Sequence, residues 1–137
     1  MNSKVEDEVL RLHSFFEEWF NGMLDNTDDV FQQRFRKAMH EQFTFCPPDG
    51  RRIPFETLSR TIRERHGVHQ NDESGSITIN IRDFHELTAD GGLSIVEYRE
   101  WQAINGEEDG RFTTAVFVED GSAPGGVAWF RVHETSI

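Results

Sequence analysis

Acidic, basic and aromatic side chains recur at every second position in the segment Leu93–Ile104. Glu97, Arg99 and Trp101 would share one face of an extended strand, because successive side chains of a strand point to opposite sides. A carboxyl group can move a proton, and a guanidinium can bind an anion or a developing negative charge. One interpretation is a polar patch inside an apolar pocket. The alternative, which we favour, is a ladder of ion pairs on a side of the sheet that faces solvent or a second subunit.

The last strand-like segment repeats this arrangement. Alternation would place Trp129, Arg131 and His133 on one face, whereas Glu134 is the single charged residue on the opposite, apolar face. Histidine is the side chain best suited to exchange a proton at neutral pH, so His133 could act as a general base. This face too is either a pocket wall or, in the reading that we favour, an outer surface of the sheet. The candidate catalytic residues are Glu97, Arg99 and His133, and the candidate ligand contacts on the strands are Trp101, Trp129 and Arg131.

Aromatic residues are also concentrated near the N-terminus, in the segment Phe15–Phe20. Apolar residues recur there at helical spacing, which predicts a helix with a broad buried face. Phe16 and Trp19 are therefore candidate ligand contacts at the roof of a cavity. Ordinary core packing is the simpler interpretation.

The rest of the chain predicts the elements that would position these residues. Turn sequences separate four segments rich in β-branched and aromatic residues, which predicts a curved antiparallel sheet. Three helices and two short strands precede them, so we expect a single α+β domain over residues 1–137, with the helices covering the concave face of a cone-shaped sheet. The expected strands are Phe43–Cys46, Arg51–Ile53, Ile77–Leu87, Leu93–Ile104, Arg111–Asp120 and Gly126–Thr135. The expected helices begin at Ser3, at Asp28 (to His40) and at Pro54, as its first helical residue (to about Gly67).

Composition excludes several classes of function. The formal net charge of -11 disfavours nucleic acid and anionic membranes, because both require clustered cations. Cys46 is the only cysteine, and His66 and His69, with Asp72 and Glu73 beyond them, lack the spacing of a zinc motif. We therefore expect no metal and no cofactor. The N-terminal residues are polar and no long apolar run follows, so we expect a cytoplasmic protein.

Three motifs resemble one protein superfamily. They are Phe-Phe-Glu-Glu-Trp-Phe at Phe15–Phe20, Pro-Pro-Asp-Gly-Arg at Pro47–Arg51, and the Trp- and His-bearing strand Gly126–Thr135. With this order of elements the chain resembles nuclear-transport-factor-2-like proteins, nearest to the SnoaL-like and ketosteroid-isomerase-like branches. The resemblance implies a cystatin-like α+β cone with a pocket at its wide end and a homodimer made through the sheets. Ketosteroid-isomerase-type sites use a tyrosine and acids, but the neighbours of Tyr98 do not match that pattern, so no catalytic residue is transferred.

Three functions are consistent with this fold, because a fold alone does not choose a function. We favour a protein that binds a small apolar ligand in the cone, with catalysis unproven. The alternative is a lyase, isomerase or cyclase acting on an apolar carbonyl compound, in which Glu97 or His133 moves a proton and Arg99 or Arg131 stabilises the oxyanion. The third is a dimerisation or scaffold domain.

Overall fold

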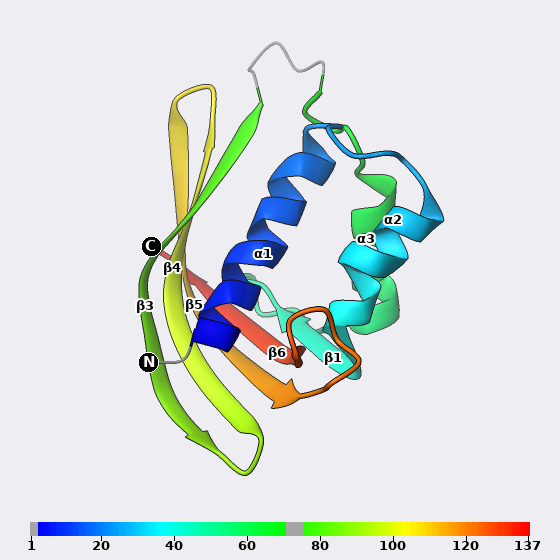
Figure 1. The fold of residues 1–137 in the computed structure, drawn as a ribbon. Coiled ribbons are helices and arrows are strands. Elements are labelled where there is room, and N and C mark those ends of the chain that lie inside the picture. The colour runs from blue at the N-terminus through cyan, green and yellow to red at the C-terminus, as the bar shows by residue number, and fades with distance from the viewer. Residues whose placement is uncertain (1–2, 71–75) are drawn as a thin grey trace.

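A curved sheet and a layer of helices on its concave side make up the molecule (Figure 1). The computed structural model describes residues 3–70 and 76–137. The α+β class and the order of helices before the long strands are confirmed. The elements are α1 (Ser3–Phe20), α2 (Asp28–Arg34), the 3-10 helix η1 (Arg36–Ala38), β1 (Met39–Cys46), β2 (Ile53–Pro54), α3 (Phe55–Glu64), β3 (Ile77–Asp90), β4 (Leu93–Ile104), β5 (Glu107–Glu119) and β6 (Val127–Ser136).

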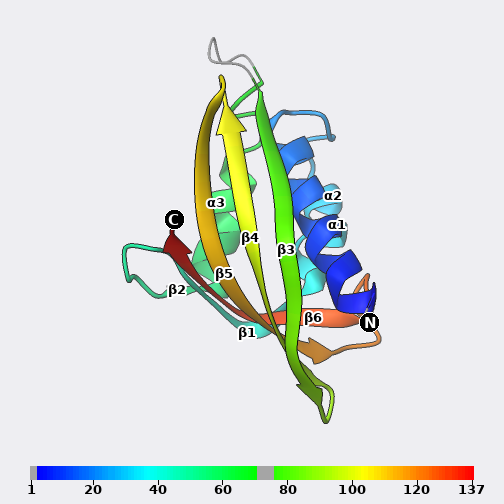
Figure 2. The same cartoon turned by 90° about the vertical axis from the view of Figure 1, so that its left-hand side faces the viewer.

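The sheet is mixed and open rather than purely antiparallel. Its strand order is β2-β1-β6-β5-β4-β3, and β3 to β6 form the expected antiparallel meander (Figure 2). β1, however, runs parallel to β6, with Phe45 opposite Val132. The short N-terminal strand thereby joins the far end of the chain. Hydrophobic alternation predicted the strands themselves but not this parallel pairing.

The second helix is shorter than the sequence predicted. The apolar residues Phe31, Phe35 and Met39 have helical spacing, yet α2 ends at Arg34 and a short 3-10 helix follows. Met39 is extended and pairs with Trp129 of β6. Pairing with β6 therefore outweighs local helix preference at this position, as tertiary contacts often do.

A two-residue turn with positive φ at both positions connects β4 to β5. Asn105 and Gly106 have φ values of 54° and 80°, and β5 begins directly after them at Glu107. Asn-Gly is the sequence that best tolerates this conformation at both central positions of a hairpin. The strand consequently starts four residues earlier than predicted, and its hairpin with β4 extends beyond the helical layer (Figure 1).

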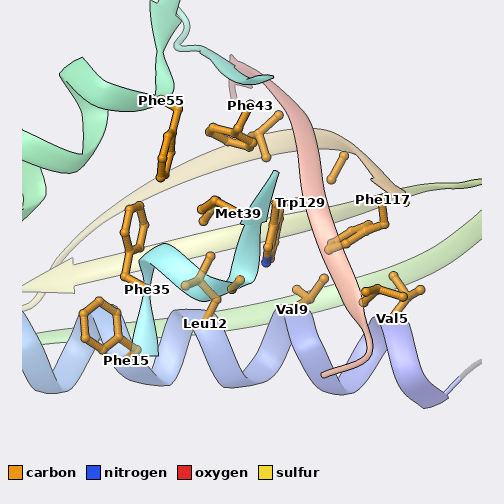
Figure 3. Packing of buried hydrophobic residues seen from close by; sticks show 14 of the residues in the cluster. Val5, Val9, Leu12, Phe15, Phe35, Met39, Phe43, Phe55, Phe117 and Trp129 are labelled. Carbon is orange, nitrogen blue, oxygen red and sulfur yellow. The ribbon is translucent and has the colours of Figure 1, made fainter. Parts of the chain in front are cut away.

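The core lies between α1 and the concave face of the sheet. Val5, Val9 and Leu12 follow one another along α1 at helical spacing and point toward Phe117 and Trp129 of the sheet (Figure 3). These side chains are buried. Among residues 3–70 and 76–137, no helix is long and apolar enough to cross a bilayer.

Candidate binding cavity

A cavity of about 160 Å³ lies between the helices and the inner face of the sheet. Its wall is largely apolar, and helices α1 and α3 together with strands β1, β3 and β6 contribute to it. Apolar protein cavities of roughly 150 Å³ stay dry and hold a molecule of the size of benzene. The volume of the hollow is therefore close to that of cavities that hold one six-membered ring. Representative lining residues are Leu12, Phe16, Met39, Leu58, Ile62 and Val132.

Six polar side chains interrupt this apolar wall. They come from α1 and from the three neighbouring strands β4, β5 and β6, and Tyr98, Glu100 and Gln102 alternate along β4 on its inner face. All six belong to one cluster linked by hydrogen bonds and charge. They are His13, Tyr98, Glu100, Gln102, Arg111 and Glu134.

His13 on α1 is held between two acceptors. Its Nδ1 lies 2.7 Å from the carbonyl oxygen of Val9, and its Nε2 lies 3.1 Å from Oε1 of Glu100. A carbonyl and a carboxylate only accept hydrogen bonds, so both ring nitrogens must donate and the ring is an imidazolium. Burial by itself would lower the pKa of His13, but the charge and hydrogen bond of Glu100 outweigh it and raise this pKa above its usual value.

Glu100 is the anion of this buried pair. Burial acts to raise its pKa, but the charge of His13 and the hydrogen bonds from His13 and Gln102 lower it below its usual value. The Gln102 side-chain amide donates to Oε2 of Glu100 at 2.7 Å. Each carboxylate oxygen therefore has a donor, as a buried charge requires.

Glu134 on β6 behaves differently. Burial and the charge of Glu100 raise the pKa of Glu134 to about 7, although the Arg111 guanidinium opposes this rise. Arg111 donates to Glu134 at 3.1 Å and to Asp109 at 3.0 Å. A carboxyl group that titrates at neutral pH can both give and take a proton, which is the property that acid–base chemistry requires. It is the one acid that the sequence showed on an otherwise apolar face.

Tyr98 adds a neutral hydroxyl to the cluster. Burial raises the pKa of Tyr98 well above its usual range, helped by the charges of Glu100 and Glu134, so the phenol stays protonated. Its hydroxyl makes no hydrogen bond with any part of the chain that the structure describes. A ligand could therefore bond to it without displacing a protein partner.

A second buried carboxylate fixes the indole at the cavity wall. Trp129 Nε1 donates to Oε2 of Glu8 at 2.7 Å, and Arg11 donates to both oxygens of Glu8 at 2.7 and 2.9 Å. Glu8 lies on α1 and Trp129 on β6, so this contact joins the helix to the sheet beside the cavity.

The outer face of β4 carries the residues that the sequence proposed as catalytic. Tyr98 and Glu100 line the cavity, so alternation places Glu97, Arg99 and Trp101 on the opposite face of β4. This face of the sheet lies away from the helices (Figure 2). Arg99 lies 3.5 Å from Asp83 across the β3–β4 hairpin and contributes nothing to the cavity. Glu97, Arg99 and Trp101 therefore do not form a polar patch inside the pocket, which corrects the first interpretation. Their position agrees with the alternative, in which they lie on the outer face of the sheet.

A bulge explains the change of face along β6. Val116 of β5 is opposite Arg131, but the next residue, Phe117, is opposite Trp129, so one residue of β6 has no counterpart. Trp129 therefore faces inward with Val132 and Glu134, whereas Arg131 and His133 do not line the cavity. The prediction that Trp129, Arg131 and His133 share a face is wrong for this reason. Arg131 instead donates to Cys46 Sγ at 3.2 Å, and His133 is exposed.

The aromatic candidates separate into two groups. Phe16 and Trp129 line the cavity, and their role as ligand contacts stays a prediction. Trp19 is fully buried in the core, where its Nε1 donates to the carbonyl oxygen of Ile62 at 2.8 Å. His66 packs against Trp19 with its ring centroid 4.6 Å away, whereas Asp72 and Glu73 lie outside the described residues.

Comparison with known families gives this chain an assignment. Residues 5–137 match the sequence model described as "Sucrose-6-phosphate phosphohydrolase C-terminal". The chain belongs to this family. A relative, sucrose-phosphatase 1 of Nicotiana tabacum, is 25% identical over 129 residues, which cover 93% of this chain and 29% of the relative. This member of the sucrose-6-phosphate phosphohydrolase C-terminal family therefore spans less than a third of that relative's length.

Solved structures confirm the nuclear-transport-factor-2-like fold of this family member. An NTF-2-like protein of unknown function from Pseudomonas aeruginosa has a TM-score of 0.83 and 20% identity, with 98% of each chain covered. A protein with a cystatin-like fold from Caulobacter vibrioides has a TM-score of 0.68 and 10% identity, with 97% of this chain and 87% of that chain covered. The S. rosetta CaMKII hub has a TM-score of 0.65 and 13% identity, with 96% and 95% covered. At these identities the similarity establishes the fold alone.

Proposed function

We propose that this chain binds a small, mainly apolar molecule in the cavity between its helices and its sheet. The observation that supports this most directly is the hollow of about 160 Å³ with an apolar wall and one polar cluster. Ligand sites typically combine apolar walls with a few placed polar groups that orient the ligand. The volume suits one ring with a short polar substituent.

The lining argues against a sugar phosphate in this particular hollow. Sucrose-phosphatase 1 is similar to this chain, but a sugar presents a hydroxyl on most of its carbons. Each hydroxyl buried without a partner would cost free energy, and side chains such as Leu12, Met39 and Ile62 offer no partner. An apolar ring therefore fits the wall better.

A thermal-shift and calorimetric screen with single-ring compounds tests the proposal. Benzyl alcohol, phenol and cyclohexanone are suitable probes. A ligand that binds only the folded state raises stability by about 2.7 kcal/mol at one hundred times its Kd, so Tm should increase with concentration. The proposal fails if no single-ring compound changes Tm or produces heat of binding.

A matched pair of variants ties any binding to the cavity. Leu58→Trp places an indole in the hollow, whereas Leu87→Trp makes the same change at an exposed position of β3. Leu58→Trp should abolish binding while its circular dichroism stays native, and Leu87→Trp should bind like the wild type. Equal binding by both variants would place the ligand elsewhere.

Self-association through the outer face of the sheet is a second candidate. Half-buried apolar side chains lie on this face, among them Trp101, Phe112 and Val116. No helix within residues 3–70 and 76–137 covers it (Figure 2). A CaMKII hub shares the fold. Sedimentation should give a mass about twice the 15.9 kDa of one chain. Val116→Arg should produce a monomer and Thr57→Arg, at an exposed position of α3, should not; a monomeric wild type would overturn this candidate.

A further inference from the structure

We propose that the ligand of this cavity carries a cationic nitrogen, as a protonated amine or an amidine, that binds at Glu134 and Tyr98. The inference rests on the proposed binding function and adds the chemical class of the ligand. It follows from the contacts that the six polar side chains of the cluster already make and from those that they leave open.

The cations of the cluster already have anionic or carbonyl partners. His13 uses both ring nitrogens, one on the Val9 carbonyl and one on Glu100. Arg111 directs one terminal nitrogen to Glu134 and the other to Asp109. A carboxylate or phosphate on a ligand would have to share one of these cations with a protein carboxylate.

The open positions are mostly acceptors. Glu134 accepts a hydrogen bond from Arg111 at Oε1, and its Oε2 makes none with the described residues. The Tyr98 hydroxyl is also without a partner among them and can accept as well as donate. A ligand nitrogen that bears several N–H groups complements both.

The charges of the cluster point in the same direction. Within the cavity two carboxylates, Glu100 and Glu134, lie beside two cations, His13 and Arg111, but Arg111 is shared with the exposed Asp109. Burial and the charge of Glu100 raise the pKa of Glu134 to about 7, so the site takes up a proton more readily than a free carboxyl group. A ligand cation would compensate the charge in place of that proton.

Three compounds of similar shape separate the effect of charge from that of size. Benzamidine is cationic, benzamide is neutral and benzoate is anionic at pH 8. We expect titration calorimetry at pH 8 to show benzamidine binding about tenfold or more tightly than benzamide, and benzoate binding weakest, because a charge-assisted hydrogen bond is stronger than a neutral one. Benzamidine should also displace the proton of Glu134 near pH 7, so its apparent enthalpy should depend on the ionisation enthalpy of the buffer.

Glu134→Gln tests the residue itself. Glutamine keeps the shape and can still accept a hydrogen bond from Arg111, but it removes the charge. The preference for benzamidine over benzamide should be lost in this variant and should persist in Glu97→Gln, which neutralises a carboxyl on the outer face of the same sheet. Circular dichroism and Tm confirm that both variants are folded.

The outcomes distinguish this inference from the binding function. Binding of benzamide or benzoate as tightly as benzamidine would overturn the cationic class and leave the cavity a binding site. A preference for benzamidine that survives in Glu134→Gln would also overturn it. If none of the three compounds binds, and benzyl alcohol, phenol and cyclohexanone also fail, the proposed function itself is wrong.

Discussion

His13 and Glu100 are 87 positions apart in the chain, yet His13 Nε2 lies 3.1 Å from Oε1 of Glu100 in the interior. The first residue belongs to α1 and the second to β4, so their contact crosses from the helical layer to the sheet. Both side chains are almost completely buried. Removing water from two charges is costly, and the pair is favourable only because Val9 and Gln102 complete its hydrogen bonds.

Removing one member of this pair should destabilise the fold strongly. His13→Leu leaves the Glu100 carboxylate buried without its counter-ion, which typically costs about 3–5 kcal/mol. Replacing both residues, as His13→Leu with Glu100→Leu, should cost less than the sum of the two single changes. Urea denaturation of the four proteins gives the coupling free energy. Additive single and double values would show that the two residues do not interact in solution.

The ionisation of His13 should be visible by NMR. The pKa of His13 is raised above 6.5 and that of Glu100 is lowered below 4.5. The contribution of His13 to stability is present below pH 6.5 and is lost as the pH rises through its raised pKa in the folded state. The contribution of Glu100 is present above pH 4.5 and is lost as the pH falls through its lowered pKa in the folded state. The pair therefore contributes most between about pH 4.5 and 6.5. The ring protons of His13 should titrate above pH 6.5 in the wild type and at a lower pH in Glu100→Gln; an unchanged midpoint would contradict the pairing.

Glu134 should make the protein less stable as the pH rises. Its pKa is 4.5 when unperturbed and about 7 in the fold, so the folded state holds a proton that the unfolded state has lost between these values. Stability from this group is present below pH 4.5 and is lost as the pH rises through 7, by up to about 3 kcal/mol. Glu134→Gln should remove this loss.

The measurement is the unfolding free energy of the wild type, Glu134→Gln and Glu97→Gln between pH 4.5 and 8. The unfolding free energy of Glu134→Gln should increase relative to that of the wild type as the pH increases. The unfolding free energy of Glu97→Gln should change with pH as that of the wild type does. Parallel curves for all three proteins would show that Glu134 titrates normally.

Gly110 provides a test of packing on the outer face of the sheet. A Cβ atom at this position would lie 2.5 Å from Cζ3 of Trp101, which is closer than real Cβ atoms approach. Gly110→Ala should therefore force the indole away and lower the stability by about 1–3 kcal/mol. Gly121→Ala is the control, because a Cβ there meets nothing within 4 Å. Similar Tm values for the two variants would mean that Trp101 moves without cost.

Local patterns in the sequence predicted the class of fold well. The alternation of Leu93–Ile104 predicted β4 with its observed bounds, and the Asn105-Gly106 dipeptide lies at a hairpin turn with positive φ at both residues. These features depend on neighbouring residues only, because side-chain alternation and turn conformation are local properties of the backbone. The helical spacing in Phe15–Phe20 likewise predicted a helix with a buried face, and Phe15 and Trp19 of α1 are buried.

Tertiary structure decided which polar residues meet. Alternation divides β4 into two faces but does not show which face the helices cover. The sequence therefore offers no reason to place Glu100 rather than Glu97 in the interior, whereas the structure places His13 of α1 beside Glu100. A bulge in β6 then reversed the alternation between Trp129 and Glu134, through a pairing with β5 that the sequence of β6 does not encode by itself.

The sequence by itself determined an α+β domain with an aromatic core, because periodicity, turn residues and composition act over short distances. Only the folded chain decided the cavity and its polar cluster, because those depend on contacts between residues as distant as His13, Glu100 and Glu134. Burial in that cluster then set the pKa of Glu134.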